Sequence, residues 1–336
     1  MDRELVLSEM RAVTDAHGPW NAHNFEVADG VYTKGSDDTS ATWARLVGVV
    51  QVVSDLAPRP IDQLRVLDLA CLEGIFGLEF AKRGAEVVGI EGRRSNLERA
   101  SFAARALELG EVQFLHEDVR SLSAETHGQF DVVLCLGILY HLDAPDVFQF
   151  LERIADVCRG FAVIETHVSL RRKERRSYGG IDYWGRSYVE HDPASTAEQR
   201  ERALRASLDN PASFWLTKRS LLRGLAEVGF TTTLVVETAV GFTRYADRLM
   251  LVAFRGSPMS PELVRGGDPT PRARAWPERD PRRPHRSQDW RERARIRIAR
   301  ALPRRALETL RRLRRRDGNP TALSDTNGRP RGSPPA

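Results

Sequence analysis

The chain has 336 residues, 41% of them hydrophobic and 29% charged, which indicates a soluble globular protein with one large domain and appendages or two ordinary domains. This composition excludes collagen-like, coiled-coil and wholly disordered classes. The longest apolar stretches, residues 46–53 and 132–140, are much shorter than the roughly 20 residues of a membrane-spanning helix. The first residues, Met1 to Glu4, lack the pattern of a secretory signal. We therefore expect a cytoplasmic protein without a transmembrane segment.

Charge and proline content divide the chain into a body and a tail. Residues 265–336 contain 21 arginines and 8 acidic residues, whereas the preceding residues contain 30 basic and 38 acidic ones. We predict an N-terminal helical or lid segment over 1–45, a main domain over 46–260 with an inserted loop at 171–211, and a Pro/Arg-rich tail over 261–336. An amphipathic helix at 288–316 could bind RNA, an anionic membrane surface or the acidic body. A solvated tail is the alternative.

Apolar segments of strand length and helix length alternate along the body. The sequence predicts, in chain order, a strand at 64–69, a helix at 74–83, a strand at 86–90, a helix at 95–109 closed by Gly110, strands at 112–116 and 130–136, a helix at 145–158, a strand at 161–165, a helix at 217–228, and strands at 231–236 and 248–254. This alternation predicts an α/β fold, a doubly wound Rossmann-like sheet with helices on both faces. In such sheets a ligand binds beyond the carboxyl ends of the strands.

Three acidic residues stand at three successive strand ends. Asp68 precedes a tight turn and Gly74, which opens a helix; the turn does not match the G-x-G-x-x-G pattern of a pyrophosphate loop. Glu91 ends the second strand and could accept hydrogen bonds from both hydroxyls of a ribose. After the third strand, Asp118 could accept a hydrogen bond from an exocyclic amine, and Val119 could pack on a purine. The set suits a nucleoside without phosphates, although Asp68 could instead cap the following helix, and Glu91 and Asp118 could be solvated turn residues.

This pattern resembles that of class I S-adenosylmethionine-dependent methyltransferases, over about residues 64–165 and more weakly to 255. The resemblance implies that Asp68 and the turn formed by Ala70, Cys71 and Gly74 hold the methionine part of S-adenosylmethionine. It implies that Glu91 holds the ribose, and that Asp118 and Val119 hold the adenine. Ala70 and Leu72 depart from the family, which often has glycine at these positions.

The fourth strand end is similar to a subgroup of these enzymes. Gly137, Leu139, Tyr140 and His141, followed by Glu165 and Thr166, resemble the methyltransferases related to enzymes that modify the wobble uridine of transfer RNA by carboxymethyl transfer. By this resemblance Gly137 belongs to the cofactor site.

Two histidines beyond strand ends are candidate catalytic residues. Methyl transfer to a hydroxyl requires removal of its proton, and a neutral histidine can do this near pH 7. We predict His167 as the base, with His141 as the second candidate and Glu165 orienting or polarising a neighbour. Alternatively, His141 packs beside the cofactor and His167 is a hydrogen-bonded loop residue.

Aromatic residues gather in two segments that could close an acceptor pocket, residues 17–25 and residues 178–191. Trp20, Tyr183, Trp184 and Trp215 could equally fill a secondary core. The widely spaced Cys71, Cys135 and Cys158 argue against disulfides and a zinc site, so we predict buried thiols and no metal.

From the family resemblance we expect the chain to be a methyltransferase that uses S-adenosylmethionine, with an oxygen of a sugar or other small secondary metabolite as acceptor. The alternatives are transfer to a transfer RNA base, with the basic tail holding the phosphate backbone, and a non-catalytic nucleoside-binding protein.

Overall fold

The computed structural model describes residues 1–237 and 246–258. The chain divides into two units, Met1–Met259 and Ser260–Ala336. The predicted tail and its helix at 288–316 therefore lie outside the described residues. Among the helices of the described part, none combines the length and apolar character needed to cross a membrane.

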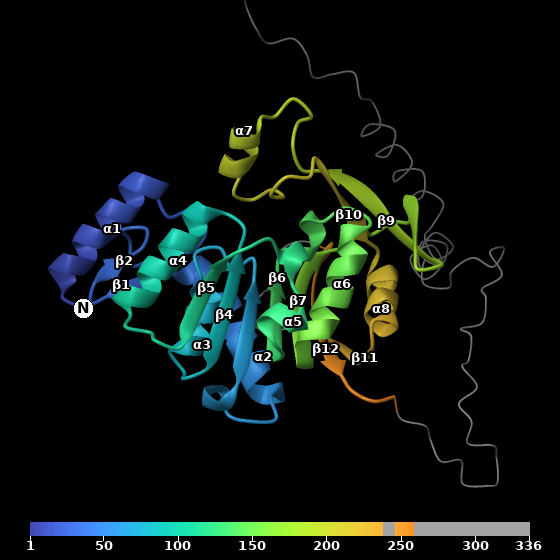
Figure 1. Ribbon diagram of the computed structural model, residues 1–336, viewed down its shortest axis with the longest axis horizontal. Coiled ribbons are helices and arrows are strands. Elements are labelled where there is room, and N and C mark those ends of the chain that lie inside the picture. Colours follow the sequence, from blue (N-terminus) through green and yellow to red (C-terminus); the bar gives the residue numbers. More distant parts are fainter. Residues whose placement is uncertain (238–245, 259–336) are drawn as a thin grey trace, which may run out of the picture. The chain divides into compact units, whose positions relative to one another are not determined.

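A seven-stranded sheet forms the centre of the first unit (Figure 1). Five neighbouring strands pair in parallel, and the last two strand pairings at one side are antiparallel. Their spatial order is β11 (Phe230–Val235), β12 (Arg248–Arg255), β7 (Cys158–His167), β6 (Phe130–Leu136), β3 (Arg65–Leu69), β4 (Glu86–Glu91) and β5 (Val112–His116). The order reverses direction at β3, which is the arrangement of a doubly wound fold. The predicted Rossmann-like sheet is thus confirmed.

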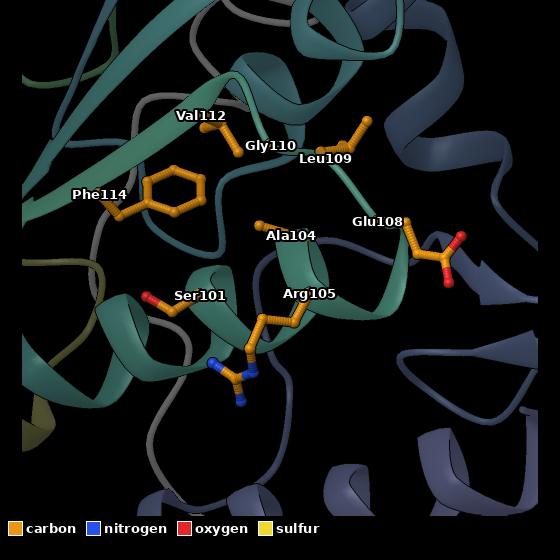
Figure 2. A pocket seen from close by; sticks show the side chains of 8 residues that line it. All are labelled: Ser101, Ala104, Arg105, Glu108, Leu109, Gly110, Val112 and Phe114. Carbon is orange, nitrogen blue, oxygen red and sulfur yellow. The ribbon is translucent and has the colours of Figure 1, made fainter. Parts of the chain in front are cut away.

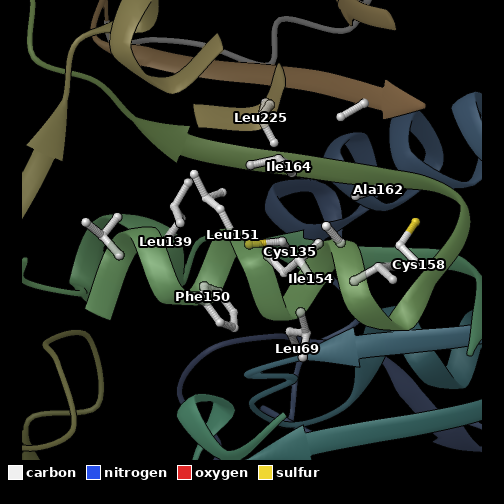
Figure 3. Close-up of a cluster of buried hydrophobic side chains, with 14 of the residues drawn as sticks. Leu69, Cys135, Leu139, Phe150, Leu151, Ile154, Cys158, Ala162, Ile164 and Leu225 are labelled. Carbon is white, nitrogen blue, oxygen red and sulfur yellow. The ribbon is translucent and has the colours of Figure 1, made fainter. Parts of the chain in front are cut away.

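Helices cover both faces of the sheet because alternate residues of each strand point to opposite sides. On one face Val66 and Val132 pack against α2 (Ser40–Leu56), α3 (Ile75–Ala81) and α4 (Arg94–Ala106). On the other, Leu67 and Val133 pack against α6 (Asp146–Val157) and α8 (Lys218–Glu227), beside the short α5 (Ala124–His127). Figure 3 shows side chains of α6 reaching toward the strands. Single-turn 3-10 helices lie at Ile61–Gln63, Val119–Ser121 and Leu139–His141.

One predicted helix end is wrong. The helix α4 ends at Ala106 and not near Gly110, because Glu108 already takes a left-handed backbone conformation with φ of 54°. A left-handed residue ends a helix whether or not it is glycine.

The N-terminal segment forms a small layer of its own. Helix α1 (Arg3–His17) packs on α4 and is followed by the hairpin of β1 (Glu26–Ala28) and β2 (Val31–Tyr32). Trp20 between them is buried against Phe25 and Phe102. This tryptophan therefore fills a core, as the alternative reading proposed.

The insertion after β7 is largely ordered structure where a loop was expected. It contains β8 (Glu174–Tyr178), β9 (Ile181–Val189), α7 (Ala197–Arg202) and β10 (Ala212–Leu216), and the three strands form an antiparallel sheet in the order β10-β9-β8. Tyr183 and Trp215 are buried and Trp184 is half-buried. The aromatic residues of this segment thus pack within its sheet and against the main domain. All three cysteines are free and buried, as predicted.

Candidate active site

In the turn after β3, two residues other than glycine adopt the left-handed backbone conformation that glycine favours. Ala70 and Leu72 have φ of 52° and 53°, and Gly74 has φ of 80°. A Cβ atom on Gly74 would lie 2.8 Å from Cζ of Phe114, so glycine is required there. Ala70 and Leu72 tolerate the left-handed region at a cost of roughly 1–2 kcal/mol each. Ala70 and Leu72, which depart from the family pattern, thus adopt the backbone region that glycine favours.

Asp68 points into the protein at the end of β3. Its side chain is 2% exposed, and Oδ2 accepts a hydrogen bond of 3.0 Å from the backbone N–H of Gly77 in the first turn of α3. Burial raises its pKa to about 7. In the neighbouring turn, burial also raises the pKa of Cys71 well above its usual value, so this thiol is a packing residue and not a nucleophile.

Four of the predicted cofactor residues and one predicted catalytic residue line a single cavity. These are Ala70, Glu91, Asp118, Val119 and His141, which come from the ends of β3, β4, β5 and β6. Asp68, Cys71, Gly74 and Gly137 are not among the lining residues of this cavity. A separate surface hollow between α4 and β5, shown in Figure 2, contains none of the predicted site residues.

Glu91 and Asp118 in this cavity accept hydrogen bonds from nearby backbone. Glu91 Oε2 accepts from Leu72 N at 2.9 Å and Oε1 from Arg93 N at 2.8 Å. Asp118 Oδ1 accepts from the backbone N of Arg120 at 2.8 Å, and its carboxylate also pairs with the Arg120 guanidinium. A carboxylate has about four acceptor positions, so Glu91 keeps capacity for a ligand, whereas both oxygens of Asp118 are already engaged by Arg120. Although partial burial opposes it, the Arg120 hydrogen bonds hold the pKa of Asp118 below its usual value.

A segment of the insertion, residues 200–210, bounds the cavity on its outer side, with Ala206 to Asn210 in the lining. The guanidinium of Arg93, which is 6% exposed, donates to five backbone carbonyls of this segment, the shortest bond being 2.9 Å to Ser207 O. Arg120 also contacts Asp209 at 2.7 Å. Two arginines that follow strand ends thus hold the insertion over the cavity.

The carboxyl ends of the parallel strands form one edge of the sheet, which we call the rim. Glu165, near the end of β7, lies on this rim at the end away from β4 and β5, and it is buried between two arginines. Its Oε2 accepts from Arg45 Nε and its Oε1 from Arg248 Nε, both at 2.6 Å. Arg45 also donates to Leu136 O at 3.0 Å. A Cβ atom on Gly137 would lie 3.7 Å from Arg45 Nη2 and from the hydroxyl of Tyr140. The two ion pairs favour a positioning role for Glu165.

Each predicted catalytic histidine pairs with a carboxylate. His141 Nδ1 lies 2.8 Å from Oε2 of Glu190, and His167 Nδ1 lies 3.2 Å from Oδ1 of Asp247. Tyr140 separates them, with ring centroids 4.3 Å from His141 and 4.8 Å from His167. Burial lowers the pKa of His167 although Asp247 opposes the shift. Burial alone would raise the pKa of Glu190, but hydrogen bonds from His141, Ser213 and Ser207 outweigh it, so this pKa lies below its usual value.

Comparison with known proteins identifies the domain to which this rim belongs. Residues 66–160 match the family model described as a methyltransferase domain. The N-terminal domain of EvdMO1, crystallised in the presence of SAH (S-adenosylhomocysteine) and D-fucose, has the same fold with a TM-score of 0.58 and 26% identity, over 76% of this chain and 98% of that one. Residues 66–160 therefore form a methyltransferase domain.

Relatives of the methyltransferase domain include O-methyltransferases. The ubiquinone biosynthesis O-methyltransferase of Psychrobacter cryohalolentis is 40% identical over 95 residues, which are 28% of this chain and 35% of that protein. The O-antigen chain terminator bifunctional methyltransferase/kinase WbdD of Escherichia coli is 33% identical over 130 residues, 35% of this chain and 17% of that protein. The chain therefore spans about a third or less of these curated relatives.

Residues at both ends of the rim fit S-adenosylmethionine. At one end, a cavity presents two carboxylates and an apolar side chain, Glu91, Asp118 and Val119, as a nucleoside requires. At the other, His23 has a buried Nδ1 with no hydrogen-bond partner among the described residues. Such an atom is expected where a ligand group completes the hydrogen bonding.

Sequence reasoning missed the arginines and two of the carboxylates of this site. Arg45, Arg93, Glu190 and Asp247 lie far along the chain from their partners, and no local pattern marks them. Arg120 could have been noticed, because it stands two residues after Asp118 in the turn after β5.

Proposed function

We propose that this chain transfers the methyl group of S-adenosylmethionine to a hydroxyl oxygen of a small molecule, and that the acceptor is a sugar or a related secondary metabolite. The pairing of His167 with Asp247 beside the methyltransferase domain is the observation on which the proposal mainly depends. The names of the relatives agree with it, since they include O-methyltransferases, an O-antigen enzyme and a domain crystallised with D-fucose.

His167 is the proposed general base. Its lowered pKa keeps the imidazole neutral near pH 7, which is the form that can accept a proton. Asp247 Oδ1 accepts from Nδ1 when that nitrogen carries the proton, and the basic lone pair then lies on Nε2. Asp247 also stabilises the imidazolium that forms after proton transfer, as an acid behind a histidine does in other enzymes.

His141 and Glu165 take supporting roles in this proposal. Bound S-adenosylmethionine supplies an electrophilic methyl group, and the protein must hold the acceptor oxygen in line with it. His141, fixed by Glu190, borders the nucleoside cavity and packs against Tyr140. Glu165 holds Arg45 and Arg248 in place. Tyr140 and Trp215 contact His167 and restrict its ring orientation.

The test is methyl transfer by the full chain to a panel of sugars that includes D-fucose, followed by mass spectrometry of the products. A general base contributes roughly 10²- to 10⁴-fold, so His167→Ala should lower turnover by that range while S-adenosylhomocysteine binding persists. His141→Ala should have a smaller effect. Full turnover by His167→Ala would contradict the base assignment, and absence of any methylated sugar would contradict the acceptor class.

Transfer to RNA and contact with a membrane surface remain predictions of the sequence. Both depend on the tail at 261–336, which lies outside the described residues, so no observation of the structure favours them over a small-molecule acceptor.

A further inference from the structure

His23 is a buried histidine whose hydrogen bonding is incomplete. The residue is 8% exposed, and its Nδ1 is buried without a partner among the described residues. Burial in the first place, and then the charges of Arg45 and Lys34, lower its pKa to about 3. The imidazole is therefore neutral, and an unsatisfied nitrogen in this setting is unfavourable unless another group binds it.

The position of His23 is set by the cofactor turn itself. The carboxylate of Glu73, which is fully buried, accepts hydrogen bonds from the backbone N–H groups of Asn21 at 2.7 Å, Ala22 at 3.1 Å and His23 at 2.7 Å. Glu73 belongs to the turn between β3 and α3. The N-terminal segment is thus fixed to the turn that the methyltransferase domain uses for its cofactor.

The ring of His23 lies at the end of the rim away from the nucleoside cavity. Its centroid is 5.9 Å from the ring of Phe76, and the guanidinium carbon of Arg45 lies 4.9 Å over the same ring. Arg45 in turn borders Gly137 at the end of β6. Neither His23 nor Arg45 lines the cavity that contains Glu91 and Asp118.

The charges around His23 indicate the kind of group that it would bind. Arg45 and Lys34 act on its ring as cations, and the nearby carboxylate of Glu73 is engaged by three backbone N–H groups; the two cations favour an anionic partner for the ring. Arg45 uses Nε and Nη2 in its bonds to Glu165 and Leu136, and within the described residues Nη1 makes no hydrogen bond. In S-adenosylmethionine the one anionic group is the carboxylate of the methionine part.

We propose that His23 donates a hydrogen bond from Nδ1 to the methionine carboxylate of S-adenosylmethionine, beside Nη1 of Arg45. The proposal rests on the cofactor of the proposed function and is independent of the acceptor. It makes the N-terminal segment part of the cofactor site, with His23 as a residue that selects ligands carrying the amino-acid group. The segment then acts as more than a packing layer over α3 and α4.

The test compares two ligands that differ in this group. S-Adenosylhomocysteine carries the amino acid, whereas 5′-methylthioadenosine has the same adenosine and sulfur without it. We expect His23→Ala and His23→Phe, the second of which fills the space, to weaken S-adenosylhomocysteine binding on the order of 10- to 100-fold, as for loss of a hydrogen bond to a charged group. Affinity for 5′-methylthioadenosine should stay within about twofold. Calorimetric titration measures both.

Three results would overturn the proposal. Equal losses for both ligands would mean that His23 only supports the fold of the segment. Unchanged binding of both would mean that its partner is not the cofactor, as would be the case for an acidic acceptor. A wild-type chain that binds both ligands equally would mean that the carboxylate is not recognised. His17→Ala, at the end of α1, is the control and should change neither affinity.

These outcomes are separate from those of the proposed function. Selective loss of S-adenosylhomocysteine affinity would support the role of His23 even if no sugar were methylated. Methylation of a sugar by His23→Ala with unaltered ligand binding would leave the proposed function in place and remove this role.

Discussion

The two ends of the cofactor rim stabilise their carboxylates in different ways. At the nucleoside end, Glu91 accepts hydrogen bonds from the backbone N–H groups of Leu72 and Arg93, whereas Asp118 beside it also pairs with the guanidinium of Arg120. At the other end, Glu165 is held by Arg45 and Arg248, which are 120 and 83 residues away in the chain. Backbone donors leave acceptor positions on a carboxylate free for a ligand, whereas two guanidinium groups engage both of its oxygens. The first arrangement suits binding and the second suits positioning.

The largest expected effect is a loss of folding stability when the pairing of Glu165 with its two arginines is broken. Glu165→Gln leaves Arg45 and Arg248 without their buried counter-charge, and breaking such a pair costs about 3–5 kcal/mol. Urea denaturation should show a loss of that size in the free energy of unfolding. The control is Asp182→Asn in the exposed pair with Arg175, for which less than about 1 kcal/mol is expected. Equal losses in the two variants would remove the distinction between the two ends.

Substitution of Glu91 at the nucleoside end should lower the affinity for the cofactor product. Glu91→Ala removes a charge-assisted acceptor for the ribose hydroxyls and should weaken S-adenosylhomocysteine binding by about 1.5–3 kcal/mol. Calorimetric titration measures this loss, and Glu91→Gln separates the charge from the shape. Glu86→Gln, at the exposed start of the same strand, should bind as the wild type does. Wild-type affinity in both Glu91 variants would contradict the ribose assignment.

A substitution in the turn after β3 measures the backbone strain at Ala70. Ala70 has a left-handed backbone conformation, which destabilises the fold by roughly 1–2 kcal/mol when the residue is alanine. Replacement by glycine removes this strain, but the greater conformational entropy of glycine in the unfolded chain offsets part of the stabilisation. Ala70→Gly should therefore stabilise the protein by about 0.5–1 kcal/mol in thermal or urea unfolding. The opposite sign, a loss of about 1 kcal/mol, is expected for Ala12→Gly on the exposed face of α1. A loss in both variants would show that the left-handed conformation carries no strain.

The smallest expected effect is a shift in the pH profile of the wild-type chain. A general base must be neutral, so activity falls as the pH drops through its pKa. Because burial lowers the pKa of His167 from its usual value of 6.5, the acid limb of kcat/KM should lie below pH 6.5. His167→Gln should lose that limb along with most of the turnover. An unchanged acid limb in this variant would move the base assignment to another residue, with His141 the first to be examined.

The strand-end acids could be predicted because each is defined by its neighbours in sequence. Asp68, Glu91 and Asp118 follow apolar strands, and parallel strands bring their carboxyl ends to one edge. Glu91 and Asp118 do line one cavity, whereas Asp68 turns inward to Gly77. That difference depends on which way a side chain points after the strand ends, and the strand pattern does not specify it. The roles of these residues toward the cofactor stay predictions.

The partners of the histidines and of Glu165 could not be predicted. Arg45 comes from α2, Glu190 from the insertion and Asp247 from the residue before β12. Each of these residues reaches the rim because its own helix, strand or loop packs there. Its contact with a histidine or with Glu165 therefore forms only when the chain folds, and no local sequence pattern predicts it. Likewise, the expected loop at 171–211 forms strands because β10 supplies the partner for β9 after a long connection.

The amino-acid sequence by itself determined the alternation of strands and helices, hence the doubly wound sheet and the strand-end acids, while the cofactor class came from the resemblance to a known family. Short-range periodicity and propensity are sufficient for these, because each depends on residues a few positions apart. Tertiary structure alone decided that Glu165 pairs with two arginines, that Arg93 holds the insertion over the cavity, and that Nδ1 of His23 is buried with no hydrogen-bond partner in the part of the chain that the structure describes. Burial and charge pairing arise between distant segments, and only the packed chain brings those segments into contact.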